Sequence, residues 1–129
     1  MPRILIVDDQ RGVRALLQLA FQEEGYQVAT AVNGRDALRQ VERWRPDVVV
    51  MDVRMPVMSG LEALPRIRAL APETAVIIMS AYVDGMAVAE VLRLGASDFI
   101  YKPFDLDELK AKVRVALPEA EPTGRKVAR

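Results

Sequence analysis

The chain has 129 residues, of which 51% are hydrophobic and 28% are charged, values that are typical of a single soluble globular domain. Its 18 basic residues balance its 18 acidic ones, so we expect no direct binding to nucleic acid, no membrane association and a cytoplasmic location. It contains no histidine and no cysteine, which excludes imidazole bases, thiol nucleophiles and zinc sites and leaves carboxylates, hydroxyls and lysine for chemistry.

Short apolar runs alternate with amphipathic stretches of helical period along the chain. The runs predict five strands, at Arg3 to Asp8, Tyr26 to Thr30, Asp47 to Asp52, Ala75 to Ser80 and Asp98 to Tyr101. Three of these are almost continuously hydrophobic, as central strands of a parallel sheet are when helices cover both faces. The pattern therefore predicts an α/β domain in which each strand is followed by a helix.

The helices between the strands have recognisable start and stop signals. The first and fourth are expected to end at the glycines Gly25 and Gly95. A third helix is predicted near Gly60, with a late start or a kink because Pro65 removes a backbone donor. The fifth begins with Asp105 and Glu108, spaced as a helix cap and its third residue. The domain is predicted to span residues 1–117, and residues 118–129 are predicted to be a flexible tail.

Polar residues gather where the predicted strands end. Asp8 and Asp9 close the first strand, Asp52 the third and Ser80 the fourth, while Lys102 follows the fifth. The carboxyl ends of parallel strands share one edge of a sheet, and that edge holds the ligand site in open α/β folds. Singly, each residue has a plain structural reading, as a helix cap, a turn residue or a solvated lysine. Jointly, they predict one site.

Three carboxylates at one site repel each other by about 4 kcal/mol per close pair at an effective dielectric constant near 20. A cation is therefore expected among them, and a ligand set made only of oxygen atoms favours Mg²⁺. With Mg²⁺ and Lys102 the three carboxylates sum to zero charge. Adding a phosphoryl group to Asp52 leaves the site near minus one, a load that the metal and the lysine can bear.

The motifs ILIVDD, MDVRMPVMSG, IIMSAY and LGASDFIYKPFD occur in the order and spacing of bacterial two-component response-regulator receiver domains. The resemblance covers about Arg3 to Leu117, and the segments ILIVDDQ, EGYQ and KPFD are most similar to the stand-alone sporulation phosphorelay type. It implies a single doubly wound (βα)₅ domain of the flavodoxin-like kind, with strand order 2-1-3-4-5. It also implies a signalling module that catalyses its own phosphorylation and dephosphorylation at Asp52.

For the metal, the resemblance implies that Asp9, Asp52 and the backbone carbonyl of Arg54 bind Mg²⁺ directly and that Asp8 acts through water. A sensor histidine kinase or a histidine phosphotransferase would then deliver the phosphoryl group to Asp52. A downstream effector protein would read the result or take the phosphoryl group onward.

For the phosphoryl group, the resemblance implies that Ser80 and Lys102 hold its oxygens, that Ala81 leaves room for it, and that the Lys102–Pro103 peptide is cis. Ser80 and Phe99 would form the switch, in which the Phe99 ring turns inward when Ser80 moves toward the phosphoryl group.

Two further expectations concern side chains around the site. Val13 and Leu16, with Pro103 and Phe104, should form an apolar rim that contacts the histidine donor, although Leu16 could instead be core. Arg54 and Tyr82 should cover the phosphoryl group and slow its hydrolysis, although both could project into solvent.

Four alternatives stay open at this point. The chain could be the receiver part of a longer DNA-binding regulator, or a receiver that only binds partners. An FMN-binding flavodoxin would need a glycine- and hydroxyl-rich loop where Asp8 to Gly12 stand. A metal-dependent phosphatase with an aspartate nucleophile would need a second Asp two residues after the first, where Gln10 follows Asp8 and Arg54 follows Asp52.

Overall fold

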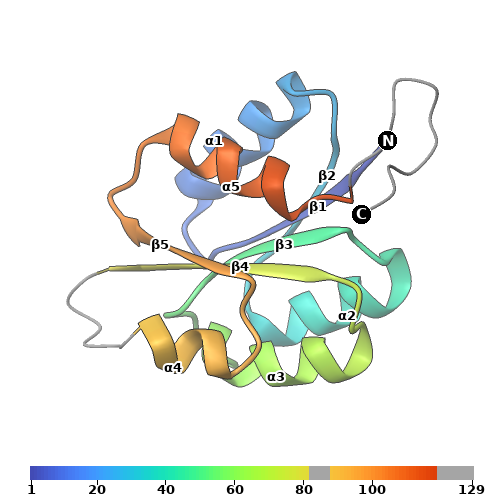
Figure 1. The fold of residues 1–129 in the computed structure, drawn as a ribbon, viewed down its shortest axis with the longest axis vertical. Coiled ribbons are helices and arrows are strands. Elements are labelled where there is room, and N and C mark those ends of the chain that lie inside the picture. Colours follow the sequence, from blue (N-terminus) through green and yellow to red (C-terminus); the bar gives the residue numbers. More distant parts are fainter. Residues whose placement is uncertain (82–87, 119–129) are drawn as a thin grey trace.

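The computed structural model describes residues 1–81 and 88–118. Within this part of the chain, strands and helices alternate from end to end (Figure 1). The elements are β1 (Arg3–Val7), α1 (Arg11–Glu23), β2 (Gln27–Ala31), α2 (Gly34–Trp44), β3 (Val48–Asp52), α3 (Gly60–Leu70), β4 (Ala75–Ala81), α4 (Val88–Arg93), β5 (Asp98–Lys102) and α5 (Leu106–Ala116).

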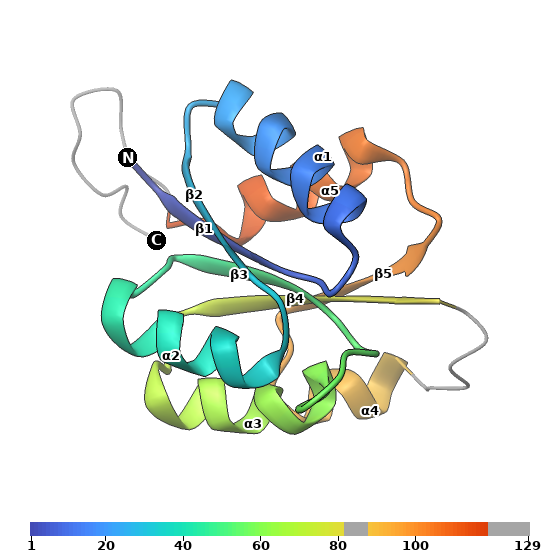
Figure 2. The same cartoon turned by 180° about the vertical axis from the view of Figure 1, so that it is seen from behind.

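The strands form one parallel sheet in the order β2-β1-β3-β4-β5. Helices α1 and α5 cover one face, and α2, α3 and α4 cover the other (Figures 1 and 2). Each strand lies within one residue of its predicted bounds. The predicted α/β fold and strand order are therefore confirmed, and the carboxyl ends of all five strands lie at one edge of the sheet.

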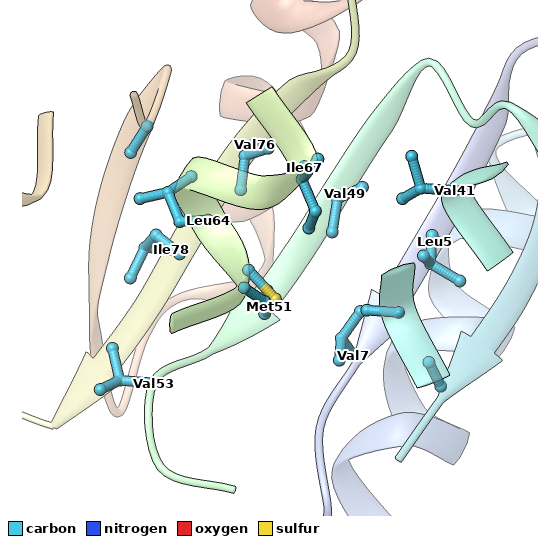
Figure 3. Close-up of a cluster of buried hydrophobic side chains, with 14 of the residues drawn as sticks. Leu5, Val7, Val41, Val49, Met51, Val53, Leu64, Ile67, Val76 and Ile78 are labelled. Carbon is cyan, nitrogen blue, oxygen red and sulfur yellow. The ribbon is translucent and has the colours of Figure 1, made fainter. Parts of the chain in front are cut away.

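The core consists of two hydrophobic clusters, one on each face of the sheet. Side chains of β1 alternate between them: Leu5 and Val7 face the side of α2 and α3, and Ile4 and Ile6 face the side of α1 and α5. Figure 3 shows the first cluster, in which helix α3 contributes Leu64 and Ile67 among others. Burial of both faces explains why the central strands read as unbroken hydrophobic runs.

Helix α3 begins at Gly60 and runs without interruption through Pro65, so the predicted late start is wrong. Its start is fixed by a capping box, in which Ser59 and Glu62 each accept a hydrogen bond from the other's backbone N–H. The backbone N–H of Gly60 also donates to the Val53 carbonyl at 2.8 Å. These contacts outweigh the single helical hydrogen bond that Pro65 cannot make.

The other helix ends mostly follow the sequence signals. Gly25 and Gly95 have φ of +91° and +116°, as expected of residues just past helix ends. Asp105 caps α5, but its carboxylate accepts from the N–H of Asp107 and not from that of Glu108. The predicted tail, apart from its first residue, lies outside the described residues. Among the described helices, none is both long enough and apolar enough to cross a membrane.

The loop between β3 and α3 has a strained residue at its tip. Val57 has a φ of +70° and is 70% exposed. The N–H of Met58 donates to the Pro56 carbonyl at 2.7 Å, which closes a three-residue turn around Val57. A β-branched side chain is unfavourable at positive φ, and here no burial compensates for it.

We expect Val57→Gly to raise the free energy of unfolding by about 0.5–1 kcal/mol, because the released strain exceeds the added backbone entropy of the unfolded chain. Urea denaturation of both proteins measures the difference. Val115 of α5 offers a matched control, since it is 86% exposed but helical, and Val115→Gly should lower stability. A loss of stability in Val57→Gly would show that the turn is not strained.

Candidate phosphoacceptor and metal site

The predicted site residues come from four of the five strands. Asp8 directly follows β1, Asp52 is the last residue of β3, Ser80 is the last but one of β4, and Lys102 is the last of β5. The strands run parallel and in register, so these residues lie at the same edge of the sheet.

An ammonium group joins two buried carboxylates at this edge. Lys102 Nζ lies 3.0 Å from Asp8 Oδ2 and 3.3 Å from Asp52 Oδ1. Asp8 is fully buried and Asp52 is 8% exposed. Charged groups are costly to bury unless they are paired, so Lys102 makes it possible for the two carboxylates to stand together.

Backbone donors fix how these carboxylates point. Asp8 Oδ1 accepts from the N–H of Gln10 at 2.8 Å, and Asp52 Oδ1 accepts from the N–H of Val53 at 2.9 Å. The guanidinium of Arg14 donates to the backbone carbonyl of Asp8 at 2.8 Å, which ties the first helix to the end of β1. Asp8 Oδ2 thus pairs with the Lys102 ammonium, while Oδ1 accepts a hydrogen bond from the backbone.

Asp8, Asp9 and Asp52 each offer a carboxylate oxygen, and these three atoms lie within 4.8 Å of one another. Two oxygens bound to the same Mg²⁺ lie up to about 4.2 Å apart, given metal–oxygen distances near 2.1 Å. The cluster is therefore close to the size that one ion spans, and Asp9 is exposed where an ion could enter. With Lys102 the group has a charge of minus two, which suits a divalent cation.

The two ionisable groups that face each other in the site both have raised pKa values. Burial raises the pKa of the Asp52 carboxyl above its ordinary value, the charge of Lys102 opposes this, and the charge of Asp8 adds to it. Burial acts to lower the pKa of Lys102, but the hydrogen bond to Asp8 and the charges of Asp52 and Asp8 outweigh burial. The lysine therefore stays protonated while Asp52 is ionised at a cost.

The remaining predicted residues lie around this centre. Ser80 is buried, and its hydroxyl donates to the Ala81 carbonyl at 3.1 Å. Phe99 is 7% exposed and packs its ring edge-to-face against Tyr101, with 4.7 Å between the centroids, so it already lies inward here. Arg54 is an exposed residue of the loop after β3, and Tyr82 lies outside the described residues. The Lys102–Pro103 peptide is cis, which confirms the expectation.

Beside the carboxylates the surface is hollowed by a largely apolar depression of about 450 Å³. We call it the α1–β5 hollow, and it is lined by Gln10, Val13, Leu16, Leu17, Ala81, Lys102, Pro103 and Phe104. Leu16 is 55% exposed whereas Leu17 is fully buried, so Leu17 is the core residue of the pair. The four residues of the predicted apolar rim all line this hollow.

Gly60 is a residue whose importance to the site the sequence analysis missed. A Cβ atom at this position would lie 2.1 Å from the backbone oxygen of Asp52, so no larger residue fits there. The sequence did contain a signal for a helix start at Gly60, because Ser59 and Glu62 have the spacing of a capping box. The absence of a side chain lets α3 begin directly against the strand that carries Asp52.

We predict that Asp52→Asn is more stable than the wild type at neutral pH in EDTA, because the variant avoids ionising a buried carboxyl. A raised pKa in the folded state means that the wild type loses stability as the pH rises through that pKa. The advantage of the variant should therefore disappear below the ordinary carboxyl pKa of about 3.9. Thermal unfolding of both proteins across this pH range is the measurement, and a variant less stable at neutral pH would contradict it.

Comparison with known proteins agrees with this geometry. The family described as the response regulator receiver domain matches residues 4–114. The sporulation initiation phosphotransferase F of Bacillus subtilis is 45% identical over 116 residues, which cover 90% of this chain and 94% of that protein. The regulatory protein AtoC of Escherichia coli is 49% identical over 115 residues, which cover 89% of this chain but 25% of AtoC.

The chain thus spans a quarter of one relative and nearly all of the other. Among solved structures, the response regulator TrrA of Thermotoga maritima in complex with Mg(2+)-BeF superposes with a TM-score of 0.81 at 38% identity, over 91% of this chain and all of that one. A Francisella receiver domain gives a TM-score of 0.83 at 32% identity, over 90% of this chain and 96% of that one. The chain belongs to the response regulator receiver domain family.

Proposed function

We propose that this receiver accepts a phosphoryl group on Asp52 in a reaction that depends on Mg²⁺. The observation that carries the proposal is the Lys102 ammonium held between buried Asp8 and Asp52, with a third carboxylate within 4.8 Å. Because burial raises the pKa of the Asp52 carboxyl, its ionised oxygen is less well stabilised than in water, which favours its attack on phosphorus.

In the proposed reaction, a carboxylate oxygen of Asp52 attacks the phosphorus of a phosphohistidine on a sensor kinase or histidine phosphotransferase. The phosphorus–nitrogen bond of the donor breaks as the new oxygen–phosphorus bond forms, and the departing imidazole takes up a proton. Such transfers depend on positioning and charge stabilisation more than on covalent help from the protein.

The residues that would hold Mg²⁺ are Asp9, Asp52 and the backbone carbonyl of Arg54, with Asp8 acting through water. When bound, the ion supplies positive charge beside the transferring phosphoryl group. Asp8 is fully buried and already engaged by Lys102 and a backbone N–H, which suits an indirect role. Exposed Asp9 suits a direct one.

Lys102 and Ser80 would contact the phosphoryl oxygens. Lys102 Nζ is 3.3 Å from the oxygen of Asp52, so it needs little movement to reach a group attached to that carboxylate. Ser80 is buried one strand away, with its hydroxyl turned to the adjacent carbonyl, and it would have to rotate toward the phosphoryl group. Ala81 would leave space for the incoming group.

We further propose that Ser80 and Phe99 transmit the change. Residues 78 and 99 are paired in the β4–β5 register, and 80 and 101 are paired two residues farther along, so Ser80 and Phe99 lie close together in adjacent strands. A shift of Ser80 is therefore carried to the strand that bears Phe99, whose ring contacts Tyr101 at the surface of β5. The readout would be a changed surface for a downstream effector protein.

The α1–β5 hollow is the proposed contact for the protein that donates the phosphoryl group. It is apolar, it adjoins Asp52 through Lys102, and its rim of Val13, Leu16, Pro103 and Phe104 is accessible from outside. A helix carrying the phosphohistidine could rest its apolar face in the hollow and present the imidazole to the carboxylates.

Residues 1–117 form the proposed receiver unit. The same unit is present in the longer relatives and in the Bacillus relative that it covers almost entirely, so the chemistry proposed for Asp52 does not depend on which kind of output follows. A second candidate, in which this chain is the receiver of a longer DNA-binding regulator, therefore differs from the first only in the output.

Incubation with acetyl phosphate and Mg²⁺ should add one phosphoryl group to the wild type and none to Asp52→Asn. EDTA should abolish the gain, because the three carboxylates then repel the incoming anion. Intact mass spectrometry measures it. Equal labelling of the variant would refute Asp52 as the acceptor.

Mg²⁺ binding itself is best followed at the amides near Asp9, since Trp44 lies beside Arg3 at the opposite edge of the sheet.

Phe104→Ala should slow phosphorylation by a phosphohistidine donor protein about tenfold while leaving the rate with acetyl phosphate unchanged, because only the protein needs the hollow. The donor to use is the purified sensor kinase that labels the wild type fastest. Val115→Ala, which removes an exposed apolar side chain from α5 outside the hollow, is the matched control and should change neither rate. Equal slowing by Phe104→Ala with both donors would mean that Phe104 is structural.

A further inference from the structure

The junction between β2 and α2 contains a chemically labile pair that the receiver function does not use. Asn33 is the only asparagine in the chain, and it is followed by Gly34. In an asparagine–glycine pair the glycine nitrogen is unhindered, so it can attack the asparagine side chain more readily than in other pairs. Such a pair is a weak point in a protein chain.

The fold gives a reason for each member of the pair. The Asn33 side chain caps α2 by accepting from the N–H of Asp36 at 2.8 Å. Gly34 is buried against the β3–α3 loop, where a Cβ atom would lie 2.8 Å from both the Cγ and the backbone oxygen of Met58. Glycine is thus required at position 34, and a polar cap is favoured at position 33.

The same contacts oppose the reaction. The Gly34 nitrogen, which would be the nucleophile, donates its hydrogen to the Met58 carbonyl at 2.9 Å. The Asn33 side chain, whose Cγ would be attacked, is fixed in its capping orientation by the hydrogen bond from the Asp36 N–H. The Asp36 carboxylate in turn accepts from the N–H of Val32 at 3.1 Å, which holds the chain on the other side of Asn33. Both reacting groups are engaged with other partners.

We propose that Asn33–Gly34 is a deamidation site that the folded protein keeps closed through the contact between Gly34 and Met58. When this corner opens, the Gly34 nitrogen loses its proton and bonds to Cγ of Asn33, and the Cγ–Nδ2 bond breaks with release of ammonia. Water then opens the five-membered ring at either carbonyl, which gives aspartate or isoaspartate.

The two products differ in their effect on the fold. Aspartate is as good a helix cap as asparagine and keeps the backbone unchanged. Isoaspartate inserts one extra carbon atom into the main chain between positions 33 and 34. Gly34 then cannot regain its place against Met58, so the contact between α2 and the β3–α3 loop is lost permanently. Deamidation would therefore leave a lasting record of how often this corner has opened.

The first experiment compares the protein in native buffer with the protein unfolded in urea, both at mildly alkaline pH and physiological temperature. Mass spectrometry with peptide fragmentation follows the change of the Asn33 amide to an acid. Because Asp84–Gly85 can isomerise without a change of mass, it does not interfere with this readout. We expect conversion at Asn33 in urea and at least about tenfold slower conversion in buffer.

Asn33→Ser keeps a capping oxygen without an amide, and it should abolish the signal. Equal rates in buffer and in urea would overturn the protective contact. No conversion at Asn33 in urea would overturn the site itself.

A second experiment separates local from global opening with two helix-cap variants. Ser59→Ala weakens the start of α3 next to Met58, and Asp105→Ala weakens the start of α5 on the other face of the sheet. Loss of either cap costs about 1 kcal/mol of stability. A local opening that becomes easier by about 1 kcal/mol is about fivefold more frequent. We expect Ser59→Ala to deamidate about fivefold faster than the wild type and Asp105→Ala to match the wild type. Equal rates in the two variants would show that the contact at Met58 does not govern the reaction.

Discussion

The ion pairs of Lys102 are the interaction on which the site depends. Two buried carboxylates, Asp8 and Asp52, stand at the ends of neighbouring strands, and only a positive charge between them makes that arrangement tolerable. Burial of these carboxylates also raises the pKa of Asp52. With exposed Asp9 as a third carboxylate beside one lysine, the cluster has excess negative charge. The site is therefore stable enough to fold, and its net negative charge suits the divalent cation proposed for it.

Close backbone approaches connect the site at Asp52 to helices α2 and α3. Gly60 lets α3 start against the Asp52 carbonyl, and Gly34 lets α2 start against Met58 in the intervening loop. A displacement at Asp52 would therefore press directly on the backbone of Gly60 and on the loop between β3 and α3. Val57, held at positive φ in that loop, adds a residue whose conformation is already unfavourable and therefore easily changed.

The sequence predicted the strands, and the meeting of the three carboxylates with Lys102, because both follow from local patterns. Strands buried on both faces must be apolar throughout, and parallel strands bring the residues at their carboxyl ends together whatever the details of packing. The start of α3 was predicted wrongly because the helix-breaking effect of Pro65 can be read from the sequence. The contacts of Gly60 with Val53 and Asp52 are tertiary and cannot be read from it. Whether Leu16 or Leu17 enters the core likewise depends on the exact rotation of α1 over the sheet.

Lys102 also gives a physical reason why chemistry at Asp52 affects the surface. It contacts the Asp52 carboxylate and, together with Ala81, it lines the α1–β5 hollow. Its position is set by the negative charges beside it, which also keep its pKa raised. Any change in charge at Asp52 must therefore pull on a side chain that forms part of the hollow's wall. If Asp52 is phosphorylated as proposed, a donor that fits the hollow beforehand would meet a different wall afterwards, which would favour its release.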